Sequence, residues 1–316
     1  MQSRSIGAES ERRNAKPRAL ALRQLWDKHL YPYALLAPTI LVMLALVLYP
    51  VGSAINLSFR DVDIVRTDRS YGPFTLGNYR RLFRSDELWP ALRVSLLYVL
   101  IVTIACYVIG LWTAWLLNHH FRGRRLARLL ITIPWAIPLV VATNIFWWLF
   151  DKTFGMFNYA LTSSGIIDKP IDWFLNPRAA MAAVSITTIW KGYPFFTVML
   201  LAALQAIPTE LYDAAKVDGA SAWREFRSIT LPALRGVTAI VLLVNALWVF
   251  REFTVIFVLT GGGPAGATET LSIWTYLEAF GNFHMGFAAA IGVLTLLISI
   301  VAGVVFVRMS RSEFYG

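Results

Sequence analysis

The chain has 316 residues, of which 57% are hydrophobic and only 15% are charged, and its mean hydropathy is +0.57. Soluble domains carry roughly a quarter charged residues, so this composition excludes an ordinary soluble protein and indicates a membrane protein. The net charge of +10 would suit a nucleic-acid partner, but no stripe of basic and aromatic residues accompanies it, so nucleic acid is not expected.

Apolar runs long enough to cross a bilayer recur along the chain, since a spanning helix needs roughly 20 mostly apolar residues. The first run is too long for the core of a signal peptide and lacks a small-residue cleavage site, so we expect it to remain as a helix. We predict an all-α, polytopic membrane protein with six transmembrane helices, a basic tail over 1–30 and one membrane domain over 31–316. The predicted spans are 33–59, 91–117, 127–150, 180–206, 236–259 and 284–307.

The distribution of charge predicts an orientation. If the N-terminus is cytoplasmic, the four cytoplasmic segments hold about twice as many basic as acidic residues, whereas the three outer loops are nearly balanced. The positive-inside bias accounts for the net charge. It predicts cytoplasmic N- and C-termini and places the loop between the fourth and fifth spans on the same side.

Features between the first spans are less specific. Segment 60–90 mixes charged and turn residues and predicts a small external subdomain. His119 and His120 are adjacent, so their side chains diverge by about 100° on a helix, and no third ligand is near; a metal site is not expected. Pro134 and Pro138 are expected to kink the third span.

The loop between the fourth and fifth spans, residues 207–235, has the pattern of two short helices. Thr209 is expected to cap the first helix and Gly219 to end it. Ser221 is expected to cap the second helix, which Pro232 should break. The sequence therefore predicts a helix–turn–helix elbow at the cytoplasmic surface.

Both helices of this elbow have an apolar face. Trp223, Phe226 and Ile229 follow one another at intervals of three residues on the second helix, and Ala214 and Ala215 form a small-residue face on the first. One interpretation is a surface that fits a groove on another protein. The alternative is an elbow that lies among the lipid headgroups.

The same loop carries a family motif, which begins with Asp213-Ala214-Ala215 and ends with Ile229-x-Leu231-Pro232. It resembles the Glu-Ala-Ala loop of bacterial binding-protein-dependent ABC importer permeases, with aspartate in place of the usual glutamate. The resemblance implies a coupling helix that docks into a cleft on a cytoplasmic ATPase. The implied coupling residues are Tyr212, Asp213, Ala214, Ala215, Asp218, Gly219, Ala220, Trp223, Phe226, Ile229, Leu231 and Pro232.

Shorter motifs over nearly the whole chain resemble the carbohydrate-uptake permeases of the maltose and glycerol-3-phosphate importer type, specifically the first of their two different permease subunits. The resemblance implies a type I ABC importer permease fold in the bacterial cytoplasmic (inner) membrane. Its implied partners are a second, different six-helix permease, two cytoplasmic ABC ATPase subunits, an extracytoplasmic substrate-binding protein and a sugar or sugar derivative. The motifs are Leu48-Tyr49-Pro50, Ser58-Phe59, Gly77-Asn78-Tyr79, Ile133-Pro134-Trp135, Trp190-x-Gly192-Tyr193-Pro194-Phe195 and Leu259-Thr260-Gly261-Gly262-Gly263-Pro264.

Ionisable groups inside predicted spans are candidates for function, because an unpaired charge in a bilayer costs several kcal/mol. Lys191, Arg251 and Glu252 are such groups. Asn245, Trp248 and Glu252 recur at i, i+3 and i+7, so they share one face of the predicted fifth span. An aromatic ring beside amide and carboxylate groups suits a sugar, which stacks on one and hydrogen-bonds to the others.

The family resemblance implies that sugar contacts lie on the two spans that flank the loop. Two cations near this path favour a substrate with a phosphate, sulfonate or carboxylate group, such as a sulfo- or phospho-sugar or glycerol phosphate. Alternatively, Lys191 pairs with Glu252 and Arg251 faces the second permease. The predicted path residues are Thr188, Lys191, Gly192, Asn245, Trp248, Val249, Arg251 and Glu252.

No catalytic residues are expected on this chain. It lacks the Gly-x4-Gly-Lys-[Ser/Thr] phosphate loop, so ATP and Mg are expected on the partner ATPase and no cofactor on the chain itself. Its four histidines are dispersed apart from one adjacent pair, which disfavours an enzyme. The main alternative function is an ion- or proton-coupled carrier, with Lys191, Arg251 and Glu252 as the relay.

Overall fold

The computed structural model describes residues 31–62 and 72–314, which form helices joined by loops, with one isolated antiparallel bridge between Arg60 and Phe74. The predicted basic tail, 1–30, lies outside the described residues. The chain divides into two compact units, Met1–Asn56 and Leu57–Gly316, and each is described by itself.

The described part of the first unit is one apolar helix with a π turn in its middle. It consists of α2 (Tyr31–Met43), η2 (Leu44–Leu48) and most of α3 (Tyr49–Ser58). Leu35–Ser58 has a mean hydropathy of 2.2, and no residue in its most apolar window is buried. The predicted first span is therefore confirmed as a helix long and apolar enough to cross a bilayer.

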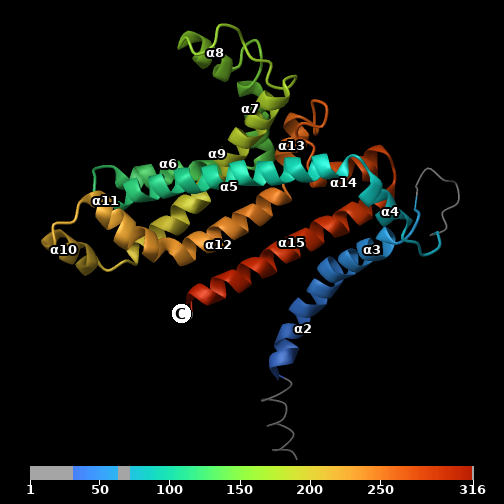
Figure 1. Ribbon diagram of the computed structural model, residues 1–316, viewed down its shortest axis with the longest axis horizontal. Coiled ribbons are helices and arrows are strands. Elements are labelled where there is room, and N and C mark those ends of the chain that lie inside the picture. Colours follow the sequence, from blue (N-terminus) through green and yellow to red (C-terminus); the bar gives the residue numbers. More distant parts are fainter. Residues whose placement is uncertain (1–30, 63–71, 315–316) are drawn as a thin grey trace, which may run out of the picture. The chain divides into compact units, whose positions relative to one another are not determined.

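The second unit contains the remaining helices (Figure 1). Among the described residues, four of them are each long and apolar enough to span a membrane: α5, α9, the continuous helix over Ala222–Phe250, and α15. The helices are α4 (Gly77–Arg84), α5 (Leu88–Asn118), α6 (Arg124–Ala136), α7 (Leu139–Leu149), α8 (Met156–Ser163), α9 (Pro177–Gln205), α10 (Thr209–Val217), α11 (Ala222–Glu225), η3 (Phe226–Thr230), α12 (Leu231–Phe250), α13 (Thr254–Leu259), α14 (Leu271–Tyr276), η4 (Leu277–Gly281) and α15 (Met285–Phe314).

The predicted third span, 127–150, is two helices rather than one kinked helix. The axes of α6 and α7 meet at 95°, and the pair counts as a sixth span only if it is taken as one broken span. Ile137 at the break is extended, with φ −72° and ψ 132°, as expected of a residue before proline. Pro138 has no N–H to continue the hydrogen bonds of α6, so the helix ends there.

The fifth span also differs from the prediction of 236–259. Its helix starts at Ala222 and ends at Phe250, and a short non-helical segment separates it from α13. Arg251 and Glu252 therefore follow the helix instead of lying on it. The side chain of Arg251 turns back, so that Nε donates to Leu247 O at 3.3 Å beside the last turn of α12.

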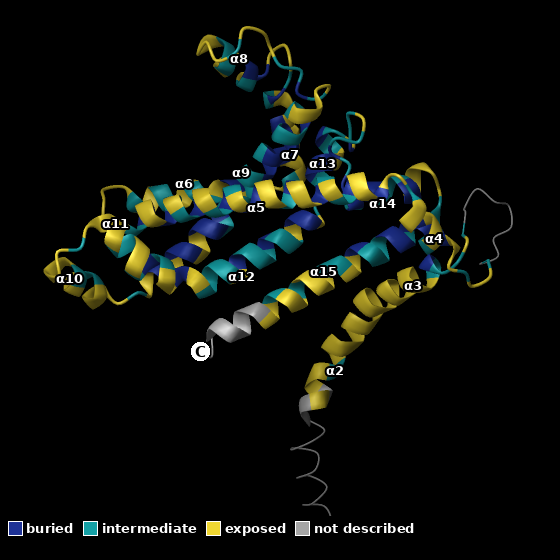
Figure 2. Cartoon of the chain, in the orientation of Figure 1, coloured by how far each residue is buried: buried dark blue, intermediate teal, exposed yellow. Residues whose placement is uncertain are grey.

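The core of the second unit forms where α5 runs alongside α9 and α12 packs against both. Tyr98, Val102, Phe196, Leu200 and Leu234 are almost fully buried there. Apolar side chains are also exposed over the length of α3 and along α5 (Figure 2). Such large exposed apolar surfaces are those that lipid or another membrane protein covers.

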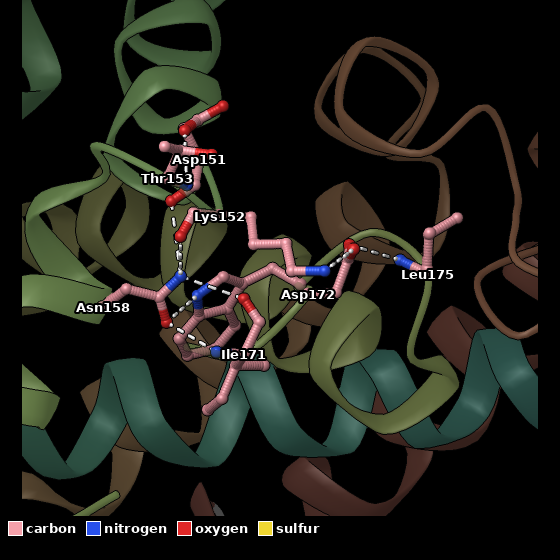
Figure 3. Close-up of polar contacts among 8 residues, drawn as sticks. Asp151, Lys152, Thr153, Asn158, Ile171, Asp172 and Leu175 are labelled. Atoms are coloured by element: carbon pink, nitrogen blue, oxygen red, sulfur yellow. Dashed lines mark hydrogen bonds and ion pairs between the residues drawn. The ribbon is translucent and has the colours of Figure 1, made fainter. Parts of the chain in front are cut away.

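The loop between α7 and α9 folds around Asn158 of α8, which is buried (Figure 3). Its Nδ2 donates to Ile171 O at 2.9 Å and to Lys152 O at 3.2 Å, while its Oδ1 accepts from Ile171 N at 3.0 Å and from Trp173 Nε1 at 3.2 Å. Lys152 and Asp172 add an ion pair of 3.2 Å. A buried amide satisfied in this way joins α8 to the segments before and after it in the loop.

Candidate functional site

The predicted elbow is present, with two corrections to its ends. Gly219 ends α10 with φ +73°, and Ser221 Oγ caps the next helix by accepting from Arg224 N at 3.4 Å. Thr209 does not cap α10, because Pro208 occupies the N-cap position and makes no side-chain cap. The second helix does not break at Pro232.

The continuation of the second helix has a local cause. Phe226–Thr230 forms a π turn, after which α12 begins at Leu231 with Pro232 in its first turn. The helix therefore continues through the proline, which removes one backbone hydrogen bond to the preceding turn without ending the helix. The elbow is therefore one short helix, α10, joined by a short turn to the base of the long helix that contains α12.

One side of the elbow is fastened to the membrane helix and the other is free of the rest of the second unit. The Tyr212 hydroxyl and Thr230 Oγ1 lie 2.9 Å apart and join α10 to the base of α12. Asp213 is exposed and pairs with Lys216 on the same helix at 3.3 Å. Along the motif, the exposed residues are Asp213, Ala214, Asp218, Gly219, Trp223 and Pro232, and the half-buried ones are Tyr212, Ala215, Ala220, Phe226, Ile229 and Leu231.

The predicted apolar stripe does not face outward as a single surface. Trp223 and Phe226 stack with ring centroids 5.8 Å apart and line a groove of about 650 Å³ against Trp112 and Trp115 of α5. The exposed side of α10, with Asp213, Ala214 and Asp218, is a separate surface.

The predicted path residues gather around a cavity of about 150 Å³, midway along α9 and near the end of α12. Seven of the eight line it, and Arg251 is the exception. Four further lining residues were not predicted as path residues, although Trp135 and Phe195 belong to motifs that carry the family resemblance. The lining residues are Trp135, Leu139, Thr188, Lys191, Gly192, Phe195, Asn245, Trp248, Val249, Glu252 and Val255.

The floor of the cavity is a set of hydrogen bonds between α5, α9 and α12. Tyr98 OH and Thr188 Oγ1 are 2.7 Å apart, and Thr103 Oγ1 donates to Asn245 Oδ1 at 3.0 Å. A Cβ on Gly192 would lie 3.1 Å from Cys106 Sγ, so glycine allows α9 to approach closely here. These contacts hold the polar groups in fixed positions.

Glu252 reaches the cavity from the turn after α12, not from the helical face predicted for it. Its Oε1 accepts from Val255 N at 3.0 Å and so caps α13. Carboxylates are favourable at a helix N-terminus, where backbone N–H groups lack partners. This contact keeps the carboxylate at the cavity wall.

Lys191 has a set of backbone carbonyls as its partners instead of Glu252, the partner that was considered from the sequence. Its Nζ donates to the backbone carbonyls of Pro134 at 2.8 Å, of Trp135 at 3.0 Å, and of Ile137. Among the ion pairs of the described residues, Lys191 with Glu252 does not occur. The alternative in which these two residues form an ion pair is therefore wrong for this structure.

Three aromatic side chains form one wall of the cavity. Phe195 lies between Trp135, with centroids 6.1 Å apart, and Trp248, with centroids 5.1 Å apart. Trp135 is 50% exposed and Trp248 is 49% exposed, so this wall is open on one side. The site thus combines an open aromatic wall with a fixed amide and a fixed carboxylate.

Comparison with known proteins agrees with this architecture. Residues 107–313 match the family described as binding-protein-dependent transport system inner membrane component. The chain belongs to this family and is a permease subunit of an ABC importer.

Several curated relatives match most of the chain. The trehalose/maltose transport system permease protein MalF of Thermococcus litoralis is 34% identical over 88% of this chain and 93% of its own length. The sulfoquinovosyl glycerol transport system permease protein SmoG of Agrobacterium fabrum is 33% identical over 88% and 90%. A solved bacterial ABC transporter for the acidic polysaccharide alginate has the same fold, with a TM-score of 0.79 at 21% identity, over 92% of this chain and 99% of that one.

Proposed function

We propose that this permease translocates a sugar, and that the cavity between α9 and α12 is its half of the binding site. The aromatic wall of Trp135, Phe195 and Trp248 supports the proposal, because sugar rings stack on aromatic faces. Asn245 and Glu252 add donors and acceptors for hydroxyl groups. The relatives named for trehalose/maltose, diacetylchitobiose and sulfoquinovosyl glycerol transport lend further support.

Within that class we propose a neutral sugar as the substrate. The Lys191 ammonium hydrogen-bonds to three carbonyl groups and Arg251 does not line the cavity, so the two cations that favoured an anionic substrate are otherwise engaged or elsewhere. A sulfonated sugar belongs in the substrate panel all the same, because one relative is named for such a substrate.

We also propose the partners. The exposed side of α10 would dock on a cytoplasmic ABC ATPase, of which the importer would hold two copies. Hydrolysis of ATP, with its Mg, would take place on those subunits, and this chain would bind no cofactor. The open side of the aromatic wall would face a second, different permease, and an extracytoplasmic binding protein would deliver the sugar. Support comes from the exposure of Trp135 and Trp248 and from the solved relative in complex with its periplasmic protein.

The proposed location is the bacterial cytoplasmic membrane, with several crossings and both termini in the cytoplasm. The positive-inside bias of the segments between the spans supports this orientation. In this orientation the elbow would lie in the cytoplasm and the loop around Asn158 outside.

The aromatic wall gives the test. In the importer reconstituted with its partners, Trp248→Ala is expected to lower sugar uptake about tenfold, since stacking on an aromatic ring contributes roughly 0.5–1.5 kcal/mol beyond area burial. Trp89→Ala is the control, because Trp89 is also exposed, at 66% against 49% for Trp248, and lies outside the cavity. The initial uptake rates of neutral and sulfonated sugars are measured for both variants. An equal loss in both, or none in either, would contradict the proposed site.

A further inference from the structure

The break between α6 and α7 leaves backbone carbonyls without their usual donors. In a continuous helix, Pro134 O would accept from the N–H of residue 138, but that residue is proline and has none. Ile137 is extended, so the chain leaves the helix before the next carbonyl, Trp135 O, can be satisfied along α6. Unpaired carbonyls in a membrane protein cost several kcal/mol each unless another group reaches them.

Lys191 from the middle of α9 reaches these carbonyls. Its ammonium group has three N–H donors, and Pro134 O, Trp135 O and Ile137 O are three acceptors around it. The charge also lies at the C-terminal end of α6, where the helix dipole favours a cation. The ammonium therefore fits this position in number of donors and in charge.

The same contact fixes part of the proposed substrate cavity. Trp135 is held through its backbone carbonyl, while its ring lies beside Phe195 in the aromatic wall. Lys191 thus holds the aromatic wall in position through its contact with the α6–α7 break. It precedes Gly192, which lines the same cavity.

We propose that the carbonyls of Pro134, Trp135 and Ile137 form a cation site that the protein fills with its own Lys191 ammonium, and that Lys191 is a positioning residue that holds Trp135 at the cavity. The cation site does not depend on the substrate, whereas the effect on transport rests on the proposed function. A small free alkylammonium ion should occupy the site when the lysine side chain is removed. The atoms lost in Lys191→Ala correspond to n-propylammonium.

The first experiment measures occupancy of the cation site by thiol labelling and does not depend on transport. Cys106 is the sole cysteine of the chain, so Ile137→Cys in a Cys106→Ala background places one half-buried thiol at the break and keeps the backbone carbonyl of residue 137. In full-length protein in membranes, Lys191→Ala is expected to raise the maleimide labelling rate at least about tenfold, because hydrogen bonds to a charged group are lost. Millimolar n-propylammonium should restore the slow rate. Lys191→Met, whose uncharged side chain fills the space, should label fast and should not respond.

The second experiment measures sugar uptake by the assembled importer. Uptake should fall at least about tenfold in Lys191→Ala and recover with n-propylammonium, while Lys152→Ala, which removes a lysine from the ion pair with Asp172, should leave uptake unchanged. If labelling is rescued but the unsubstituted importer moves no sugar, the cation site stands and the proposed function fails. Unchanged labelling in Lys191→Ala, or no effect of n-propylammonium on it, overturns the cation site.

Pro138→Ala tests the same site if Lys191→Ala inserts poorly. It supplies an N–H that Pro134 O can accept from once Ile137 turns to helical angles, so the double variant should insert better and label more slowly than Lys191→Ala alone. Equal insertion and labelling of the single and double variants would overturn the proposal.

Discussion

Replacing Gly219 by proline is expected to abolish uptake while the chain remains inserted in the membrane. Gly219 has φ +73° at the turn after α10, and its N–H donates to Lys216 O at 3.0 Å. Proline fixes φ near −65° and has no N–H, so the turn must be rebuilt at a cost of about 1–3 kcal/mol or more. If the exposed side of α10 docks on the ATPase, as proposed, the rebuilt turn would change the orientation of α10 relative to the base of α12 and so disrupt that contact.

Gly165 offers a closely matched control for this substitution. It has φ +71°, it has no neighbouring atom within 4 Å of an added Cβ, like Gly219, and its N–H donates to Thr162 O at 3.1 Å. Gly165→Pro imposes the same local strain in the loop after α8. Uptake and the amount of ATPase that co-purifies are measured for both variants at equal insertion. Equal losses in the two, or undiminished uptake in Gly219→Pro, would refute the coupling role of the elbow.

Gly110→Ala is expected to destabilise the fold by about 1–3 kcal/mol, the usual cost of overpacking a core. An added Cβ would lie 2.3 Å from the Cβ of Phe196, which is fully buried, and 3.1 Å from Thr197 N. Neither neighbour can move independently, because both belong to α9 where α5 runs against it. The two helices must therefore separate, and the hydrogen bond of 2.6 Å between Thr113 and Thr197 should weaken with them.

Gly303→Ala is the control for the helical glycine. Gly303 lies within α15 and has no atom within 4 Å of an added Cβ, so alanine there should be neutral or stabilising by up to about 1 kcal/mol. Thermal unfolding of the detergent-purified protein compares the two. A Tm for Gly110→Ala at or above that of Gly303→Ala would contradict the close packing of α5 against α9 at Gly110.

The long apolar helices could be predicted because the bilayer imposes a length that a single sequence window can report. Their exact ends could not. The run over 236–259 stays apolar on average across Arg251 and Glu252, yet the side chain of each turns to a nearby backbone group and the helix stops. Pro232 was predicted to break the helix, but the helix continues through it after the π turn of Phe226–Thr230.

The lining residues of the cavity were likewise predicted where they depend on helix spacing and missed where they depend on contacts between distant parts of the chain. The residues on α9 and α12 were predicted because family resemblance and helical spacing place them on facing helices. Trp135 and Leu139 were missed because their position depends on the 95° break between α6 and α7. The backbone carbonyls at that break accept hydrogen bonds from Lys191, more than fifty residues away in the sequence, so no local sequence pattern predicts the break. For this reason, neither alternative considered for Lys191, an ion pair with Glu252 or a contact with an anionic substrate, included these carbonyl groups.

Uptake into proteoliposomes that contain this chain and its importer partners tests the central claim most directly. With a panel sugar and its binding protein outside, accumulation should require ATP inside and should persist when the proton gradient is collapsed. Uptake that continues without ATP and stops with the gradient would make the chain an ion-coupled carrier and contradict the account.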